Sequence, residues 1–189
     1  MARWESDAET VRQFDTAVIS GLLQTSGYAR AVLSTFHELI LLDADPASGP
    51  SVAEAVSARV KRQEVLADIT KSFHFLLAES ALGNRVCSPD EMPAQIQRLR
   101  QVARQDNVSL MIIPADAMWR VPPMHGFQIL DEKTVVVDLL NTTLESHTKA
   151  DARMYRQVFD WLSEHADRDI DPILDRYLDL YVNLIRSHS

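Results

Sequence analysis

The sequence predicts an α+β fold in which helices pack against a mostly antiparallel sheet. Short apolar runs typical of buried strands occur at 73–78 and 108–113. The segments 126–130 and 134–140 flank a short polar turn, which predicts an antiparallel hairpin. The C-terminal part of the chain holds two runs of apolar residues at helical spacing, which predict a pair of helices.

The remaining elements follow in chain order. Residues 8–19 alternate weakly between apolar and polar, and we interpret them as extended. Thr25 can cap the helix that comes next, and the segment 43–50, with its prolines and glycine, is typical of a loop. Ser51 opens a further helix, whose apolar positions keep helical spacing as far as Ile69.

Another helix start is predicted after the central apolar strand. Ser88 can cap this helix, Pro89 suits its first position, and Glu91 would complete a capping box. The apolar spacing predicts that the helix runs to about Gln105.

Length and composition favour one domain. A chain of 189 residues, of which 46% are hydrophobic, can bury a substantial core, and its 24% of charged residues is ordinary for a globular protein. We therefore expect a single domain over 1–189, with a core at about 5–165 and a last helix at 172–187.

Charge and cysteine content restrict the partners and the compartment. The net charge of −8 argues against nucleic acid as a direct ligand, because proteins bind DNA phosphates through clustered Lys and Arg. The single cysteine, Cys87, allows no disulfide within the chain, and no apolar run suits a signal peptide or a membrane span. We expect a cytoplasmic protein without membrane contact.

Motifs that bind metals, phosphates or cofactors are absent from the sequence. It contains no HExxH or CxxC, no glycine-rich phosphate loop and no GxSxG nucleophile turn. We therefore expect neither a metal nor a cofactor, so that any catalysis would be acid–base or positional.

Several segments are distinctive in combination and occur in a fixed order. They are Gly21-Leu-Leu-Gln-Thr25, Tyr28-Ala-Arg30, Arg59-Val-Lys-Arg62-Gln63, Phe75-Leu-Leu-Ala-Glu79-Ser-Ala-Leu82, and strand patterns at 108–114, 126–127 and 135–138. From about residue 5 to residue 165 the chain thereby resembles the DUF5753 family, the ligand-sensing half of actinobacterial helix-turn-helix regulators. The resemblance implies a domain that senses small molecules.

The chain also differs from the usual pattern of this family. Family members usually carry an N-terminal helix-turn-helix of the Xre type, whereas this chain begins almost at the family domain, and its initiating Met favours a free-standing version. Ser20 stands where the family usually has proline, and Asp138 stands where the closing strand usually has glutamate.

Polar residues in the family motifs are the first candidates for ligand contacts. Gln24 and Tyr28 lie at a loop-to-helix junction, where they either tie the turn or form the mouth of a pocket. Arg59 and Arg62 share a helix face. Glu79 follows a buried strand, and it either pairs with one of these arginines or lies in a cavity with a raised pKa, as a general acid.

The loop between two of the predicted strands, residues 117–125, is the second candidate region. It carries Trp119, Arg120 and His125, and loops on a rigid sheet often hold binding groups. This loop either covers the core or closes an apolar cavity for a small molecule. Aromatic side chains that would shape such a cavity include Phe75 and Phe127.

Three functions fit these observations. The first is a binding module for a small apolar or aromatic molecule, or for a small regulatory protein, in regulation or natural-product biosynthesis. The second is a cofactor-independent biosynthetic enzyme for a cyclisation or condensation, such as a Pictet–Spengler ring closure or a cycloaddition, with Glu79, Asp138 and His125 as acid–base groups. The third is an interaction protein that forms a homodimer through its C-terminal helices.

Overall fold

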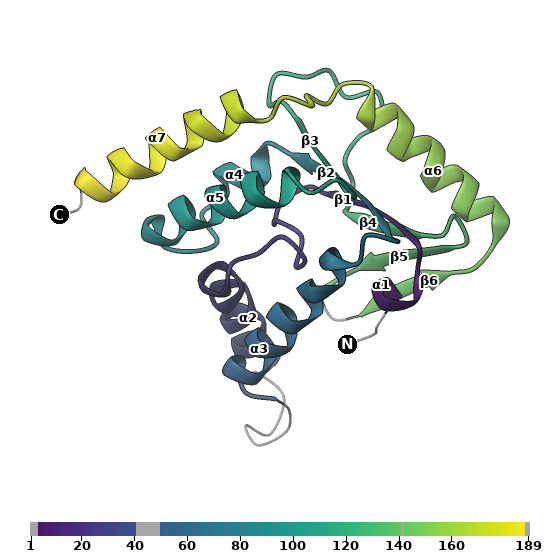
Figure 1. Ribbon diagram of the computed structural model, residues 1–189, viewed down its shortest axis with the longest axis horizontal. Coiled ribbons are helices and arrows are strands. Elements are labelled where there is room, and N and C mark those ends of the chain that lie inside the picture. Colours follow the sequence, from purple (N-terminus) through teal and green to yellow (C-terminus); the bar gives the residue numbers. More distant parts are fainter. Residues whose placement is uncertain (1–3, 41–49, 141, 188–189) are drawn as a thin grey trace.

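The computed structural model describes residues 4–40, 50–140 and 142–187, and a mixed sheet lies at its centre (Figure 1). The strands are β1 (Thr10–Asp15), β2 (Ser72–Ala78), β3 (Val108–Ile113), β4 (Phe127–Leu130), β5 (Thr134–Asp138) and β6 (Thr143–Ser146). Within the described residues their order is β3-β2-β1-β4-β5-β6. The pairs β1–β2 and β2–β3 are parallel, and the other three pairs are antiparallel.

Helices cover both faces of this sheet. They are α1 (Trp4–Asp7), α2 (Ser26–Ile40), α3 (Val52–Arg62), α4 (Ser80–Gly83), α5 (Met92–Ala103), α6 (Lys149–Ser163) and α7 (Asp171–Ser187), with 3-10 turns η1 (Gln63–Ala67) and η2 (Pro89–Glu91). The expected α+β class, with a mainly antiparallel sheet and helices at the C-terminus, is therefore confirmed.

Alternation along the strands divides the core into two clusters. Side chains on one face of the sheet pack under α2, α4, α5 and α7, and they include Val11, Phe73, Phe75, Leu110 and Val136. Side chains on the opposite face pack under α6, and they include Phe14, Leu76, Met111, Phe127 and Ile129. These two surfaces are called the α5 face and the α6 face below.

The two C-terminal helices lie on opposite faces of the sheet (Figure 1). Phe159 and Leu162 of α6 join the core of the α6 face. Ile173 and Leu174 of α7 join the core of the α5 face, where Arg100 of α5 forms an ion pair with α7. The two apolar stripes are covered only in part, since Met154 of α6 is 54% exposed and Tyr177 and Leu178 of α7 are half-buried; the homodimer expected through these helices stays a prediction.

Capping explains two of the predicted helix starts. The Thr25 hydroxyl accepts the Tyr28 N–H at 3.3 Å at the start of α2. Ser51 and Glu54 form a reciprocal capping box at the start of α3. The predicted apolar spacing as far as Ile69 is wrong, because α3 ends at Arg62 and Ile69 is 86% exposed after the 3-10 turn.

The predicted capping box at Ser88 is also wrong. The Ser88 side chain makes no capping bond, because residues 89–91 wind into a 3-10 turn in which the Glu91 N–H donates to the Ser88 carbonyl at 3.1 Å. Helix α5 begins only at Met92 and ends at Ala103. The predicted loop 43–50 lies outside the described residues except for its last residue.

Candidate ligand-binding site

The α5 face changes from apolar to polar where β1, β4 and β5 lie side by side. Alternate strand positions place four polar side chains on this part of the sheet: Gln13, Asp15, Gln128 and Asp138. Gln13 stands directly opposite Gln128 in the antiparallel pairing. Because sheet faces that are covered by helices are mostly apolar, this row sets the region apart from the rest of the core.

A chain of hydrogen bonds fixes the two glutamines. The Ser20 hydroxyl and the Gln128 side-chain amide both donate to Gln13 Oε1, each at 2.9 Å. Gln13 Nε2 in turn donates to Asp15 Oδ1 at 2.9 Å. Gln13 is buried and makes three side-chain hydrogen bonds, so it holds the Asp15 carboxyl in one orientation.

This row lines an open cavity of about 240 Å3, called the carboxylate cavity below. The Asp138 carboxylate lies on its wall and accepts a hydrogen bond from the Thr143 hydroxyl at 2.9 Å. Burial raises the pKa of Asp15 to about 7; the Gln13 hydrogen bond opposes this shift, and the charge of Asp138 adds to it. Asp15 therefore exists in both protonation states near neutral pH.

Arg59 of α3 interacts electrostatically with Asp138, although neither Arg59 nor Arg62 lines the carboxylate cavity. Burial, together with the charge of Arg62, lowers the pKa of Arg59 to about 10, and Asp138 acts in the opposite direction. Arg59 donates to Gln24 Oε1 at 2.8 Å, and Arg62 lies 3.9 Å from Glu5 Oε1. Asp138 thus interacts electrostatically with a carboxyl group on one side and a guanidinium on the other.

The two family motifs around Gln24 and Gln63 form hydrogen bonds with each other and do not line the carboxylate cavity. Gln63 Nε2 donates to the carbonyls of Gly21 and Gln24 at 2.9 and 2.8 Å, and Gln24 Nε2 donates to the Ile19 carbonyl at 2.7 Å. A Cβ atom on Gly21 would lie 2.8 Å from Nη2 of Arg62, so the glycine leaves room for that side chain. Gln24 therefore ties the turn to α3, the structural alternative considered for it.

Tyr28 and Phe75 are core residues. Their exposed fractions are 0% and 1%, and the Tyr28 hydroxyl accepts the Ile19 N–H at 3.3 Å. Neither side chain has surface to offer a ligand, so we assign both to packing.

Glu79 has a different partner from those expected. Its carboxylate accepts from Arg176 of α7 at 2.6 Å and from the Ala115 N–H at 2.8 Å. Burial alone would raise the pKa of Glu79, but these hydrogen bonds outweigh burial and lower it. The predicted pairing with Arg59 or Arg62 is wrong, and so is the predicted raised pKa.

The loop 117–125 packs on the α6 face, and the two residues that follow it, Gly126 and Phe127, line the carboxylate cavity. Trp119 packs on Phe14, with ring centroids 6.4 Å apart. The Arg120 guanidinium lies 4.3 Å above the ring of Trp161 and forms an exposed ion pair with Glu164. Trp119 and Arg120 therefore fasten the loop to the sheet and to α6.

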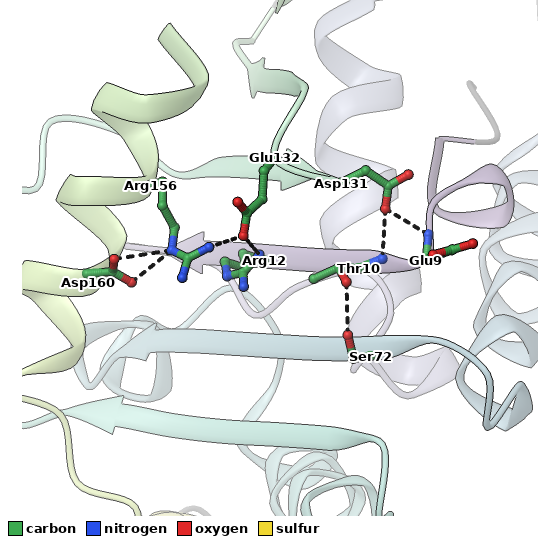
Figure 2. A network of polar contacts seen from close by, with 8 residues as sticks. All are labelled: Glu9, Thr10, Arg12, Ser72, Asp131, Glu132, Arg156 and Asp160. Carbon is green, nitrogen blue, oxygen red and sulfur yellow. Dashed lines mark hydrogen bonds and ion pairs between the residues drawn. The ribbon is translucent and has the colours of Figure 1, made fainter. Parts of the chain in front are cut away.

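Figure 2 shows a polar network at the start of β1, at the opposite end of this strand from Asp15. Asp131 and Glu132, in the β4–β5 turn, both have left-handed backbone, with φ of 50° and 57°. Asp131 accepts two backbone N–H groups at the start of β1, while Glu132 forms ion pairs with Arg12 and Arg156. These bonds hold the turn in its unfavourable conformation, so the network stabilises the fold.

The sequence indicated only part of this site. Asp138 was predicted, and Ser20 was noted as a departure from the family pattern; both belong to the carboxylate cavity or its hydrogen bonds. Gln13, Asp15 and Gln128 were missed. A usable signal existed, because these residues interrupt the apolar positions of strands otherwise buried on that face.

Two comparisons with known proteins bear on the chain. The model of the DUF5753 family, described as a domain of unknown function, matches residues 1–171, and the chain belongs to this family. No curated protein matches the chain. Helix α7, which carries Arg176, lies almost entirely beyond the matched residues.

The structure adds two findings on other classes of site. Among the described residues, no three His, Cys, Asp or Glu side chains lie close enough to hold a metal ion. No helix in the described ranges has the length and apolarity needed to cross a membrane.

Proposed function

We propose that this chain binds a small molecule in the carboxylate cavity, as a ligand-sensing domain in regulation or natural-product biosynthesis. One observation carries the proposal. The Asp15 carboxyl, whose charged form is disfavoured by burial, lines the same open cavity as a second carboxylate, that of Asp138. A desolvated carboxyl destabilises the fold, and such groups concentrate at functional sites.

The free oxygen atoms of the cavity favour a cationic ligand group. Asp15 and Asp138 each accept one hydrogen bond, and the second oxygen of each has no hydrogen bond within the described residues. Carboxylate oxygens only accept when they are ionised, and their strongest partners are N–H groups that carry positive charge. The ligand is therefore expected to present an ammonium or guanidinium group, which would displace the proton of Asp15.

Four small probes with short alkyl chains and different polar groups test this proposal: butylamine, butylguanidine, butanol and butyrate. Binding is followed by 1H–15N NMR and calorimetry between pH 5.5 and 8. We expect the two cations to bind, more tightly as the pH rises through 7, with release of a proton near neutral pH. Each of Asp15→Asn and Asp138→Asn should weaken binding by about tenfold or more, since each removes a charged hydrogen bond worth about 1.5–3 kcal/mol.

Asp179→Asn is the matched control, because this exposed residue of α7 carries the same charge and does not line the cavity. It should bind the cations like the unaltered protein. Preferential binding of butyrate, or cation binding that is unchanged in Asp15→Asn, would contradict the proposal.

Acid–base catalysis is the second candidate function, favoured by the pKa of about 7 for Asp15. A group with this pKa can donate and accept protons at neutral pH, which suits a condensation that passes through an iminium. Asp15 would take the role that the sequence analysis gave to Glu79, with Asp138 beside it.

Condensation of dopamine with phenylacetaldehyde, monitored by product formation, tests this second function. Acceleration over buffer should fall about a hundredfold in Asp15→Asn and persist in Glu79→Gln, whose side chain is bound to Arg176. An unaltered protein that gives no acceleration, or equal loss in both variants, would count against catalysis at Asp15.

A further inference from the structure

A second cavity lies on the α6 face, between the loop 117–125 and helix α6. It has a volume of about 160 Å3 and is lined mainly by apolar side chains, among them Phe14, Phe127, Pro122, Met124, Met154 and Val158. Its two polar residues are His125, from the loop, and Tyr155, from α6. We call it the aromatic cavity.

The rings around this cavity are arranged to receive another ring. The centroids of Phe14 and Phe127 are 5.6 Å apart at 58°, and those of Phe127 and Tyr155 are 4.9 Å apart at 68°. Tilted rings at these separations offer both edges and faces to an aromatic neighbour. An apolar cavity of about 150 Å3 is large enough for benzene, so the volume here suits a single six-membered ring.

The two polar residues of the lining lie close to each other. His125 Nδ1 lies 3.1 Å from the Gly126 carbonyl oxygen, which can only accept, so Nδ1 carries the proton in this contact. His125 Nε2 is then an acceptor in the neutral ring, and it lies 3.5 Å from the Tyr155 hydroxyl. A contact at that distance is a weak hydrogen bond, so both atoms can bond a ligand.

We infer that the aromatic cavity binds a phenol-sized molecule, whose hydroxyl donates to His125 Nε2 and accepts from the Tyr155 hydroxyl. The ring lies among Phe14, Phe127 and the apolar side chains of α6 and the loop. This site has Phe127 in common with the lining of the carboxylate cavity, but it does not rest on the function proposed for that cavity. It gives the loop 117–125 the second of the two roles expected for it, that of closing an apolar cavity for a small molecule.

Methionine methyl groups report directly on this site. Met124 and Met154 line the aromatic cavity, while Met118, in the same loop, does not; all three side chains are exposed, so only the lining distinguishes them. In protein labelled with 13C at the methionine methyls, p-cresol should produce saturable shifts at Met124 and Met154 and none at Met118. Toluene should bind about five- to tenfold more weakly, since it lacks the hydroxyl, and cyclohexanol should not bind.

Three variants distinguish binding in this cavity from non-specific binding. Tyr155→Phe should weaken p-cresol about fivefold and leave toluene unchanged, whereas Tyr177→Phe, on the opposite face of the sheet, should change neither. Val158→Trp should fill the cavity and abolish both. The inference is overturned if p-cresol gives no saturable shift at Met124 and Met154, or if Tyr155→Phe binds p-cresol as tightly as the unaltered protein. The Tyr155→Phe comparison decides even if Val158→Trp fails to fold.

Discussion

At the scale of single residues, Asp15 links the candidate site to the stability of the fold. The ordinary pKa of an aspartate side chain is 3.8, but burial raises the pKa of Asp15 to about 7 in the folded chain. Between these values the folded state holds a proton that the unfolded state has lost. The free energy of unfolding therefore falls as the pH rises from about 4 to about 7.

Asp15→Asn should remove this pH-dependent loss of stability, because asparagine is neutral and its oxygen can still accept a hydrogen bond from Gln13. We expect the variant to be more stable than the unaltered protein at pH 8, by on the order of 2 kcal/mol, with a smaller difference at pH 5. That figure allows for the partial exposure of the side chain. Urea unfolding at the two pH values measures it, and a variant that is less stable at pH 8 would show that Asp15 is a structural residue.

At the scale of elements, α7 secures the junction between β2 and α4. Arg176 binds Glu79, and the Tyr181 hydroxyl donates to the Leu82 carbonyl at 2.7 Å. Glu79 is only 5% exposed, so its charge depends on this partner. Since the pKa of Glu79 is lowered, the ion pair stabilises the fold above the ordinary glutamate pKa and loses this effect as the pH falls through the lowered pKa.

Arg176→Met should therefore destabilise the chain at pH 7 by about 1–2 kcal/mol, and by less at pH 4, where Glu79 can take up a proton. The estimate is modest because the Arg176 side chain is 60% exposed. Urea unfolding of Arg176→Met, Glu79→Gln and the double variant gives the coupling between the two residues. Additive effects of the two substitutions would mean that the pair contributes nothing.

The sequence predicted elements better than their partners. Apolar runs located β2 and β3, and a short polar turn located the β4–β5 hairpin, because those signals lie within a few neighbouring residues. The partner of Glu79 could not be found in this way, since Arg176 is 97 residues further along the chain. The pairing of β1 between β2 and β4 depends equally on distant contacts, and it is this pairing that places Gln13 beside Gln128.

At the scale of the whole molecule, the sheet joins the two apolar clusters into one structure. Neighbouring residues of the same strand belong to different clusters, as Phe75 and Leu76 of β2 do. Neither cluster can lose its strands without exposing the other. We therefore propose that the chain unfolds as a single domain, in agreement with the domain expected over residues 1–189.

A destabilising substitution on one face of the sheet should consequently lower the unfolding midpoint that is measured on the other face. Leu174 of α7 is fully buried on the α5 face, and Leu174→Ala should cost about 2–4 kcal/mol. In a Trp4→Phe background the remaining tryptophans, Trp119 and Trp161, report from the loop 117–125 and α6. Their fluorescence midpoint in urea should fall as far as the midpoint from far-ultraviolet circular dichroism, because both follow one transition. A fluorescence midpoint that stays in place while the dichroism midpoint falls would divide the chain into two independently stable parts.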